Sequence, residues 1–356
     1  MSFPYDGIAD YQNWSKAVTG MDSHRLDPQH GARFKISTDT KIASAGSCFA
    51  RRIAKSLRGS GLNYYDAEPG PKFLNSEQRD AHGYGAYSAR FGEVYTTLQL
   101  LQLLKRATGE FQPLETAWSG PNGLVDPFRP TIQPAGFSTL GELENDREHH
   151  LEAVRRMFAE ADIFIFTMGL TETWCHADDG AAYPLCPGRG IGSFDSQKYR
   201  FRNLGVAENV GLLCEFVEAL RELNPKTRVL LSVSPVPLAA TIEDRHVLSA
   251  STYSKSVLVV AAQEARRRYE NVDYFAAYEI VMGTFNTAEY FESDRRTVSQ
   301  SAVEHVMRSF YEKFSDVTPR VVQGAAGDEA SAALPLKPCD EDLLLMYLDR
   351  DFGKSK

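Results

Sequence analysis

Residues 41–57 read KIASAGSCFARRIAKSL, and this stretch decides the fold. An apolar run over 42–45 leads into Gly46, Ser47 and Cys48, and a helical pattern of apolar residues starts at once. A strand that turns directly into a helix places the turn at the carboxyl edge of a sheet, where the unpaired N–H groups of the helix favour a thiolate or an oxyanion. Ser47 and Cys48 are therefore both candidate nucleophiles. A glycine turn with an N-cap serine and a buried cysteine is the structural alternative.

The same alternation of strand and helix continues along the chain. Helical patterns cover 49–57, 97–107, 147–159, 206–223, 254–269 and 299–314, and apolar strand patterns cover 42–45, 62–65, 162–167, 228–234 and 272–275. Unbroken apolar strands between helices indicate a parallel sheet covered on both faces. The prediction is a three-layer, doubly wound α/β domain, in which ligands bind at the carboxyl ends of the strands.

This predicted domain spans 34–318. An irregular insertion, rich in glycine, proline and aromatic residues, occupies 66–145 after the second strand. Residues 1–33 form an N-terminal extension and 319–356 a tail, in which small residues at 324–333 indicate a linker and 340–348 a short docking helix.

Composition excludes several classes of function. The 356 residues carry a net charge of −8 without a basic cluster, which argues against a nucleic-acid partner. No apolar stretch reaches the length of a membrane span, and the N-terminus lacks a signal-peptide pattern. Five irregularly spaced cysteines indicate free thiols and a cytoplasmic protein. Cys175, His176 and Cys186 match no common zinc spacing, so no metal site is expected.

The loops that follow the predicted strands carry small polar or acidic groups. They are Gly46-Ser47-Cys48, Gly169-Leu170-Thr171-Glu172, Ser234-Pro235-Val236-Pro237, and, beyond the last strand, Asp294-Arg295-Arg296-Thr297. Because these loops meet at one edge of the sheet, they form a candidate cleft in which hydroxyl, thiol and backbone donors converge.

These segments resemble the GSCFA family, whose motif stands here as Gly46-Ser47-Cys48-Phe49-Ala50. The resemblance extends over about 34–314 and includes GLTETW at 169–174, SPVPL at 234–238 and YSKS at 253–256. The family is grouped with the SGNH, or GDSL-like, hydrolases. This grouping implies a flavodoxin-like sheet of five strands in the order 2-1-3-4-5, and an acyl-enzyme formed on the first loop.

The superfamily scheme carries over only in part. An ungapped alignment sets Gly46 on the glycine of Gly-Asp-Ser and Cys48 on the nucleophilic serine, which favours Cys48 over Ser47. In the oxyanion block Gly169 keeps the glycine, Thr171 stands where the superfamily has asparagine, and Glu172 would orient a neighbour or the substrate. The remaining glycine donor is assigned to Gly92, and Ser234 belongs to the same substrate-binding edge.

The general base is the largest departure. The superfamily's Asp-x-x-His becomes Asp294-Arg295-Arg296-Thr297, and threonine cannot exchange a proton near neutral pH as imidazole does. His150, expected at the start of a helix on the active edge, and His305 are the two candidate replacements.

Three further features of the sequence bear on substrate binding. Lys255, expected at a helix start, would bind an anionic substrate group, and Arg129 could serve similarly. The aromatic residues Tyr84, Tyr87, Phe91 and Tyr95 are expected to pack, although tyrosines at a cleft mouth would suit a sugar ring.

Two functions follow from this reading. The first is an esterase or O-acyltransferase that forms a covalent acyl-enzyme on a glycan or another hydroxyl-rich substrate, with no cofactor other than acyl-CoA as a possible donor. The second is a binding or accessory protein on an altered hydrolase scaffold, suggested by the missing histidine. The sequence specifies neither the acyl group nor the oligomeric state.

Overall fold

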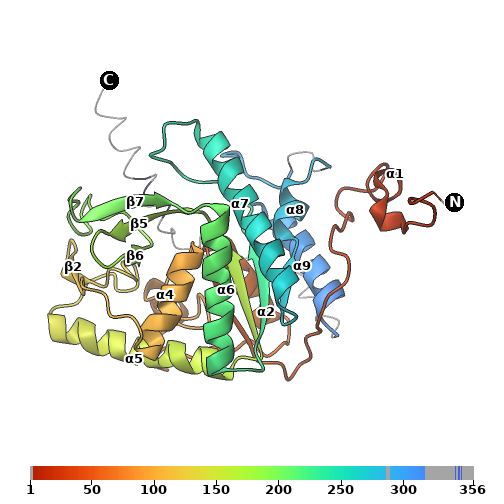
Figure 1. Ribbon diagram of the computed structural model, residues 1–356. Helices are drawn as coiled ribbons and strands as arrows, with labels where there is room; N and C mark the ends of the chain where they lie inside the picture. Colours follow the sequence, from red (N-terminus) through yellow and green to blue (C-terminus); the bar gives the residue numbers. More distant parts are fainter. Residues whose placement is uncertain (1–2, 286–288, 317–340, 342–343, 345, 347–356) are drawn as a thin grey trace.

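A parallel sheet of four strands, in the order β1-β4-β8-β9, forms the centre of this computed structural model (Figure 1). The structure describes residues 3–285, 289–316, 341, 344 and 346. The strands are β1 (Ile42–Gly46), β4 (Ile163–Met168), β8 (Arg228–Val233) and β9 (Val272–Phe275). Each lies within a residue or two of its predicted range, and the predicted three-layer α/β class is confirmed.

The predicted strand at 62–65 is reduced to a single parallel bridge between Tyr64 and Ile42. Two backbone hydrogen bonds hold it: the Ile42 N–H donates to the Asn63 carbonyl (2.9 Å), and the Tyr65 N–H donates to the Ile42 carbonyl (2.7 Å). The pairing stops there because the Ser44 N–H donates instead to the Ser88 hydroxyl, which comes from the insertion (3.0 Å). The expected fifth strand is therefore one bridge at the edge of β1.

Helices cover both faces of the sheet (Figure 1). Helices α6 and α7 lie on one face, with α4 and α5 beside them, and α2, α8 and α9 lie on the other face. Their bounds are α2 (Cys48–Gly59), α4 (Thr97–Thr108), α5 (Leu140–Glu160), α6 (Val206–Leu223), α7 (Val247–Arg268), α8 (Ala277–Met282) and α9 (Gln300–Phe314). Alternate side chains along a strand point to opposite faces of the sheet. In β4, Phe164 and Phe166 pack against α5 and α6, and Ile163 and Ile165 pack against α2 and α9.

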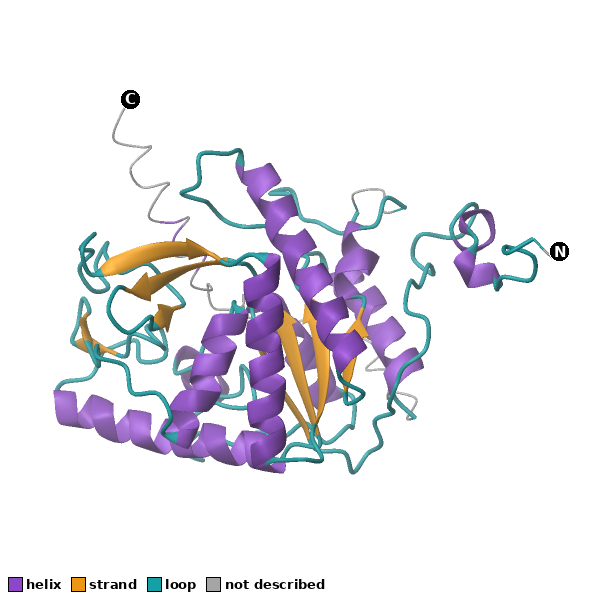
Figure 2. Cartoon of the chain, viewed as in Figure 1, coloured by secondary structure: helices purple, strands orange, loops and turns teal. Residues whose placement is uncertain are grey.

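Several elements were not predicted. A three-stranded antiparallel sheet lies beyond the carboxyl ends of β1 and β4 (Figure 2). Its strands are β5 (Glu172–His176), β6 (Ala182–Tyr183) and β7 (Tyr199–Asn203). The other short elements are β2 (Trp118–Ser119), β3 (Leu124–Val125), α3 (Ser76–Ala81), α1 (Trp14–Ala17) and η1 (Asp10–Gln12). Helices α5 and α7 also start seven residues earlier than expected, and this places His150 and Lys255 inside helices.

Of the predicted tail, the linker at 324–333 lies outside the described residues, as does most of 340–348. Within the described part of the chain, none of the helices combines the length and the apolar character needed to cross a membrane.

Candidate active site

The turn at Gly46 joins β1, β4 and α2 at the carboxyl end of the sheet. Gly46 has a φ of 149°, and a Cβ atom there would lie 2.4 Å from the Thr167 carbonyl oxygen and 2.9 Å from the Ala50 Cβ. The next N–H, that of Ser47, donates to the same Thr167 carbonyl (3.2 Å). The glycine and the alanine of the motif are therefore required for the close approach of the two strands and the helix.

Ser47 and Cys48 have different environments. Ser47 is the buried N-cap residue of α2, and its Oγ has no hydrogen-bond partner among the described residues. Its Cβ lies so close to Gly169 that a Cβ added to the glycine would be 2.9 Å away. Cys48 is the first residue of α2 and is partly exposed. Of the two nucleophile candidates, Cys48 is the more exposed.

Lys255 lies in the interior of α7 and is only 3% exposed, so the expectation of a lysine at a helix start is wrong. Its Nζ donates a hydrogen bond to the Gly169 carbonyl, next to the Ser47 turn. Burial lowers the pKa of Lys255 to about 8, and the negative charges of Glu341 and of a Cys48 thiolate partly oppose that decrease. A buried amine that exchanges its proton near neutral pH therefore lies within electrostatic reach of Cys48.

Asp294 and Thr297 bind each other and form a tight turn. The Thr297 hydroxyl donates to Asp294 Oδ2 (2.6 Å), and the N–H groups of Arg296 and Thr297 both donate to Asp294 Oδ1 (2.9 Å each). Partial burial raises the pKa of Asp294, but these hydrogen bonds outweigh it and hold the pKa below the ordinary value. The exposed Asp294 carboxylate thus holds the turn that carries Arg296, and both of its oxygens accept hydrogen bonds within that turn.

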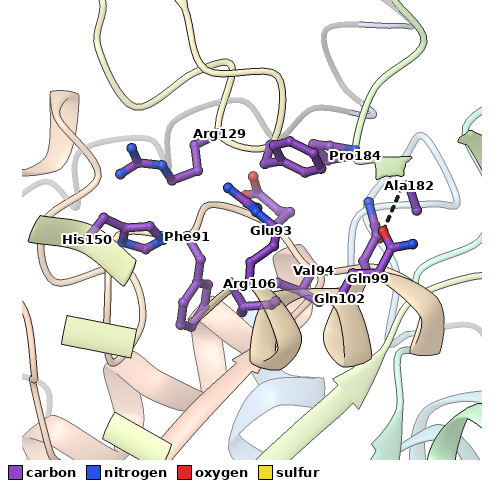
Figure 3. A pocket seen from close by; sticks show the side chains of 12 residues that line it. Phe91, Glu93, Val94, Gln99, Gln102, Arg106, Arg129, His150, Ala182 and Pro184 are labelled. Carbon is purple, nitrogen blue, oxygen red and sulfur yellow. Dashed lines mark hydrogen bonds between the residues drawn. The ribbon is translucent and has the colours of Figure 1, made fainter. Parts of the chain in front are cut away.

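His150 is not at the start of a helix, as the sequence suggested, but in the middle of α5 and fully buried. Its Nδ1 lies 2.7 Å from Glu68 Oε2. Burial, followed by the charge of Arg129, lowers its pKa. His150 lines a small cavity of about 20 Å³, and neither nucleophile candidate is among the lining residues (Figure 3). The structure therefore does not bring His150 to the nucleophile turn.

Arg129 is also buried beside this cavity and is paired with Asp126 and Asp146. It is thus part of a buried ion-pair network.

His305 is buried in α9, with its Nδ1 2.6 Å from the Tyr290 hydroxyl. Burial, followed by the charge of Arg308, lowers its pKa to about 4. Both histidine candidates are thus buried, with ring nitrogens close to Glu68 and Tyr290 respectively.

The predicted oxyanion donors of the second block are already engaged. The Thr171 hydroxyl donates to Asn203 Oδ1 (2.6 Å), and the Thr171 N–H donates to the Ser254 hydroxyl (3.0 Å). The Gly169 N–H donates to the Tyr95 carbonyl (2.8 Å). These bonds fix the loop after β4, whereas the N–H of Cys48 lies at the first position of α2.

The two other polar residues of this edge also have partners. Glu172 begins β5 and accepts a hydrogen bond from the Thr241 hydroxyl (2.8 Å), and burial raises its pKa. Ser234 is buried, and its hydroxyl accepts from the Val236 N–H (3.3 Å). They hold the loops that follow β4 and β8.

Gly92 lies in a loop that touches the turn directly. It has a φ of 70°, and two residues later the Val94 N–H donates to the Gly46 carbonyl (3.0 Å). The aromatic residues around it pack rather than line a cleft mouth: Tyr87, Phe91 and Tyr95 are buried, and Tyr84 covers the Arg90 guanidinium.

Two charged residues that act on Lys255 were not predicted as site residues. Arg296 and Glu341 form an ion pair (3.2 Å), and the charges of both act on Lys255, as does that of Cys48. Arg296 belongs to the Asp294–Thr297 segment that the sequence analysis singled out, but its position relative to Lys255 depends on how that turn folds. No local signal in the sequence identifies Glu341, because its contacts come from a distant part of the chain.

Comparison with known proteins gives one family and distant structural relatives. The model of the GSCFA family matches residues 41–310. No curated protein matches the chain. Among solved structures, a protein described as a GDSL-like lipase from Parabacteroides merdae is 13% identical, with a TM-score of 0.33, covering 79% of this chain and 98% of that one. A mutant acetyl-xylooligosaccharide esterase from Geobacillus Stearmophilus is 16% identical, with a TM-score of 0.33, covering 81% and 100%.

Proposed function

Because the chain belongs to the GSCFA family, and because Cys48 is the more exposed of the two candidate nucleophiles in the turn, we propose that it transfers acyl groups through a covalent intermediate on this cysteine. The activity is an ester or thioester hydrolase, or an O-acyltransferase that passes the acyl group to a glycan or another hydroxyl-rich acceptor. One observation supports this proposal above all: Cys48 is the partly exposed member of a buried turn, with Lys255 close to it.

The chemistry assigns a defined task to each group. The Cys48 thiol gives its proton to the neutral Lys255 amine, and the thiolate attacks the acyl carbonyl. A C–S bond forms, the bond from the carbonyl to the leaving group breaks, and the leaving group takes the proton from the Lys255 ammonium. The N–H of Cys48, at the positive end of α2, stabilises the oxyanion between these events. Water or an acceptor hydroxyl then gives its proton to Lys255 and attacks the thioester, which releases the thiolate.

A thioester is the acyl donor that suits this nucleophile. Attack by a thiolate on a thioester exchanges one sulfur leaving group for another, whereas an oxoester must release a far more basic alkoxide. We therefore propose an acyl thioester such as acyl-CoA as donor and a hydroxyl group as acceptor, with hydrolysis when water takes the acceptor's place.

Intact-mass analysis after incubation with an activated acyl ester tests the intermediate. We expect one acyl adduct on the wild-type protein and on Ser47→Ala, and loss of it in Cys48→Ala. Cys214→Ala is the matched control, because this cysteine is also partly exposed but lies on α6. An adduct that persists in Cys48→Ala would refute the assignment.

The absence of either histidine candidate from the described surroundings of Cys48 favours a second function, that of a binding or accessory protein. If folded wild-type protein forms no adduct with esters or thioesters, this second function is supported instead.

A further inference from the structure

The small cavity beside His150 lies between α4, α5 and the loop at 91–94 (Figure 3). Three nitrogen atoms of its lining residues are buried without a hydrogen-bond partner among the described residues, namely Arg106 Nη2, Arg129 Nη1 and His150 Nε2. These three residues are at most 7% exposed. Because buried polar groups in proteins are almost always hydrogen-bonded, three unpaired groups around one cavity indicate that the cavity holds a ligand.

The volume of the cavity limits this ligand to a single small particle. One water needs about 10–15 Å³ of such space, and the cavity offers about 20 Å³. Two waters or a tetrahedral oxyanion do not fit into this volume. The ligand is therefore either one water molecule or one monatomic anion such as chloride, which is somewhat larger than water.

The charge of Arg106 favours the anion. Within the described part of the chain its guanidinium forms no ion pair and lies over the ring of Phe128, 3.7 Å from the centroid. Burial lowers the pKa of Arg106 to about 10, and the charge of Asp126 opposes that decrease only in part. Arg129, by contrast, is already paired with Asp126 and Asp146. A buried charge without a counter-ion is unfavourable, and an anion compensates Arg106 whereas water does not.

His150 binds the same anion once its ring is protonated. Its Nδ1 lies 2.7 Å from Glu68 Oε2, so Nδ1 holds the proton of the neutral ring and Nε2 is then an acceptor. A negative charge in the cavity acts against the burial and the arginine charges that lower the pKa of His150. The anion therefore favours a second proton at Nε2, which donates to it. The charged groups around this part of α5 are Glu68, Arg90, Glu93, Arg106 and Arg129 from other elements, and Asp146 and Arg147 from α5 itself.

We propose that this cavity is a binding site for one monatomic anion, with chloride as its ligand, held by the two guanidinium groups and protonated His150. The loop at 91–94 contributes to the lining, and the Val94 N–H donates to the Gly46 carbonyl (3.0 Å). The bound anion thus stabilises a loop that contacts the nucleophile turn. The site does not depend on the acyl-transfer proposal, because none of the groups that hold the anion takes part in that reaction.

Unfolding in different salts tests the site without an enzymatic assay. We expect wild type to be stabilised by sodium chloride and not by sodium gluconate, whose anion is too large for the cavity, at equal ionic strength. Above the dissociation constant, each tenfold rise in chloride should lower the ratio of unfolded to folded protein about tenfold, as one bound ion requires. An equal effect of the two salts would leave water as the occupant and overturn the proposal.

Arg106→Met removes the guanidinium, keeps an apolar side chain against Phe128, and should abolish the chloride effect. Lys105→Met is the matched control. Lys105 is the preceding residue of α4, is paired with Glu215 and does not line the cavity, so this variant should keep the chloride effect. A chloride effect that survives in Arg106→Met, or that disappears in both variants, would refute the site.

The proton at His150 makes the affinity depend on pH. Because the anion raises the pKa of His150, its binding takes up a proton, and the dissociation constant for chloride should be lower at about pH 6 than at about pH 8. Equal constants at the two pH values would exclude His150 from the site and contradict the proposed set of ligands.

Crystals of the wild-type protein soaked in bromide give a direct answer even if Arg106→Met does not fold. We expect an anomalous peak in the cavity beside Arg106 Nη2. A water molecule at that position, without anomalous signal, would overturn the proposal.

Discussion

Replacing Lys255 by methionine should make the protein inactive and at the same time remove a pH dependence of its stability. The pKa of Lys255 is lowered by burial from 10.5 to about 8 in the folded chain. The unfolded chain keeps its proton up to about pH 10.5, whereas the folded chain loses it near pH 8. Stability therefore rises with pH across this window, because the unfolded state binds more protons there.

The size of the effect follows from that difference. At about pH 7 both states are protonated, and burying the ammonium costs about 3 kcal/mol relative to the neutral amine, at roughly 1.4 kcal/mol per pKa unit. Between about pH 7 and about pH 9.5, wild type should regain about 2 kcal/mol that Lys255→Met does not. Methionine fits the aliphatic space but leaves the Gly169 carbonyl without its donor, which offsets about 1–2 kcal/mol of the gain at pH 7.

Urea unfolding at the two pH values measures this term directly, with Lys55→Met as control because Lys55 is exposed on α2. We expect kcat/KM to fall at least about 10²-fold in Lys255→Met, the usual effect of losing a general acid–base group, and to be unchanged in Lys55→Met. If the stability difference between Lys255→Met and wild type is the same at both pH values, the amine does not titrate as argued. Full activity in Lys255→Met would refute its role in proton transfer.

Two further variants test the frame around the site. Gly46→Ala should lose about 3 kcal/mol of unfolding free energy, because its Cβ would lie 2.4 Å from the backbone oxygen of Thr167. Gly59→Ala is the control: the space around Gly59 is open, so its unfolding free energy should change by less than about 1 kcal/mol. Equal urea midpoints for the two variants would contradict this packing. His150→Gln should lower the free energy of unfolding by about 2 kcal/mol, because it breaks the buried contact to Glu68, and kcat of the folded protein should stay unchanged. A large loss of kcat would make His150 a candidate base again.

Local pattern was sufficient for the sheet, because an apolar strand between helices has few alternatives. Local pattern failed where a contact with a residue distant in the sequence determines the structure. The strand at 62–65 has the right composition, but Ser88, some twenty residues later, takes the N–H of Ser44 and ends the ladder. The starts of α5 and α7 were predicted seven residues too late, and this error misplaced His150 and Lys255. The antiparallel strands β5 to β7 are short and are interrupted by turns, so their pattern was lost.

At the site, sequence reasoning found the turn and the absence of a histidine, but it looked for another imidazole. Burial makes a different solution available. In the proposed reaction, Lys255, whose pKa burial lowers to about 8, accepts the proton of a thiol. A serine hydroxyl is far too weak an acid for such a partner. In the proposed reaction, a cysteine at position 48, a lysine at 255 and a threonine at 297 are therefore mutually consistent. A thiol nucleophile paired with a buried amine does not need the imidazole at the end of the Asp-x-x-His segment, and Asp294 instead holds the backbone of Arg296.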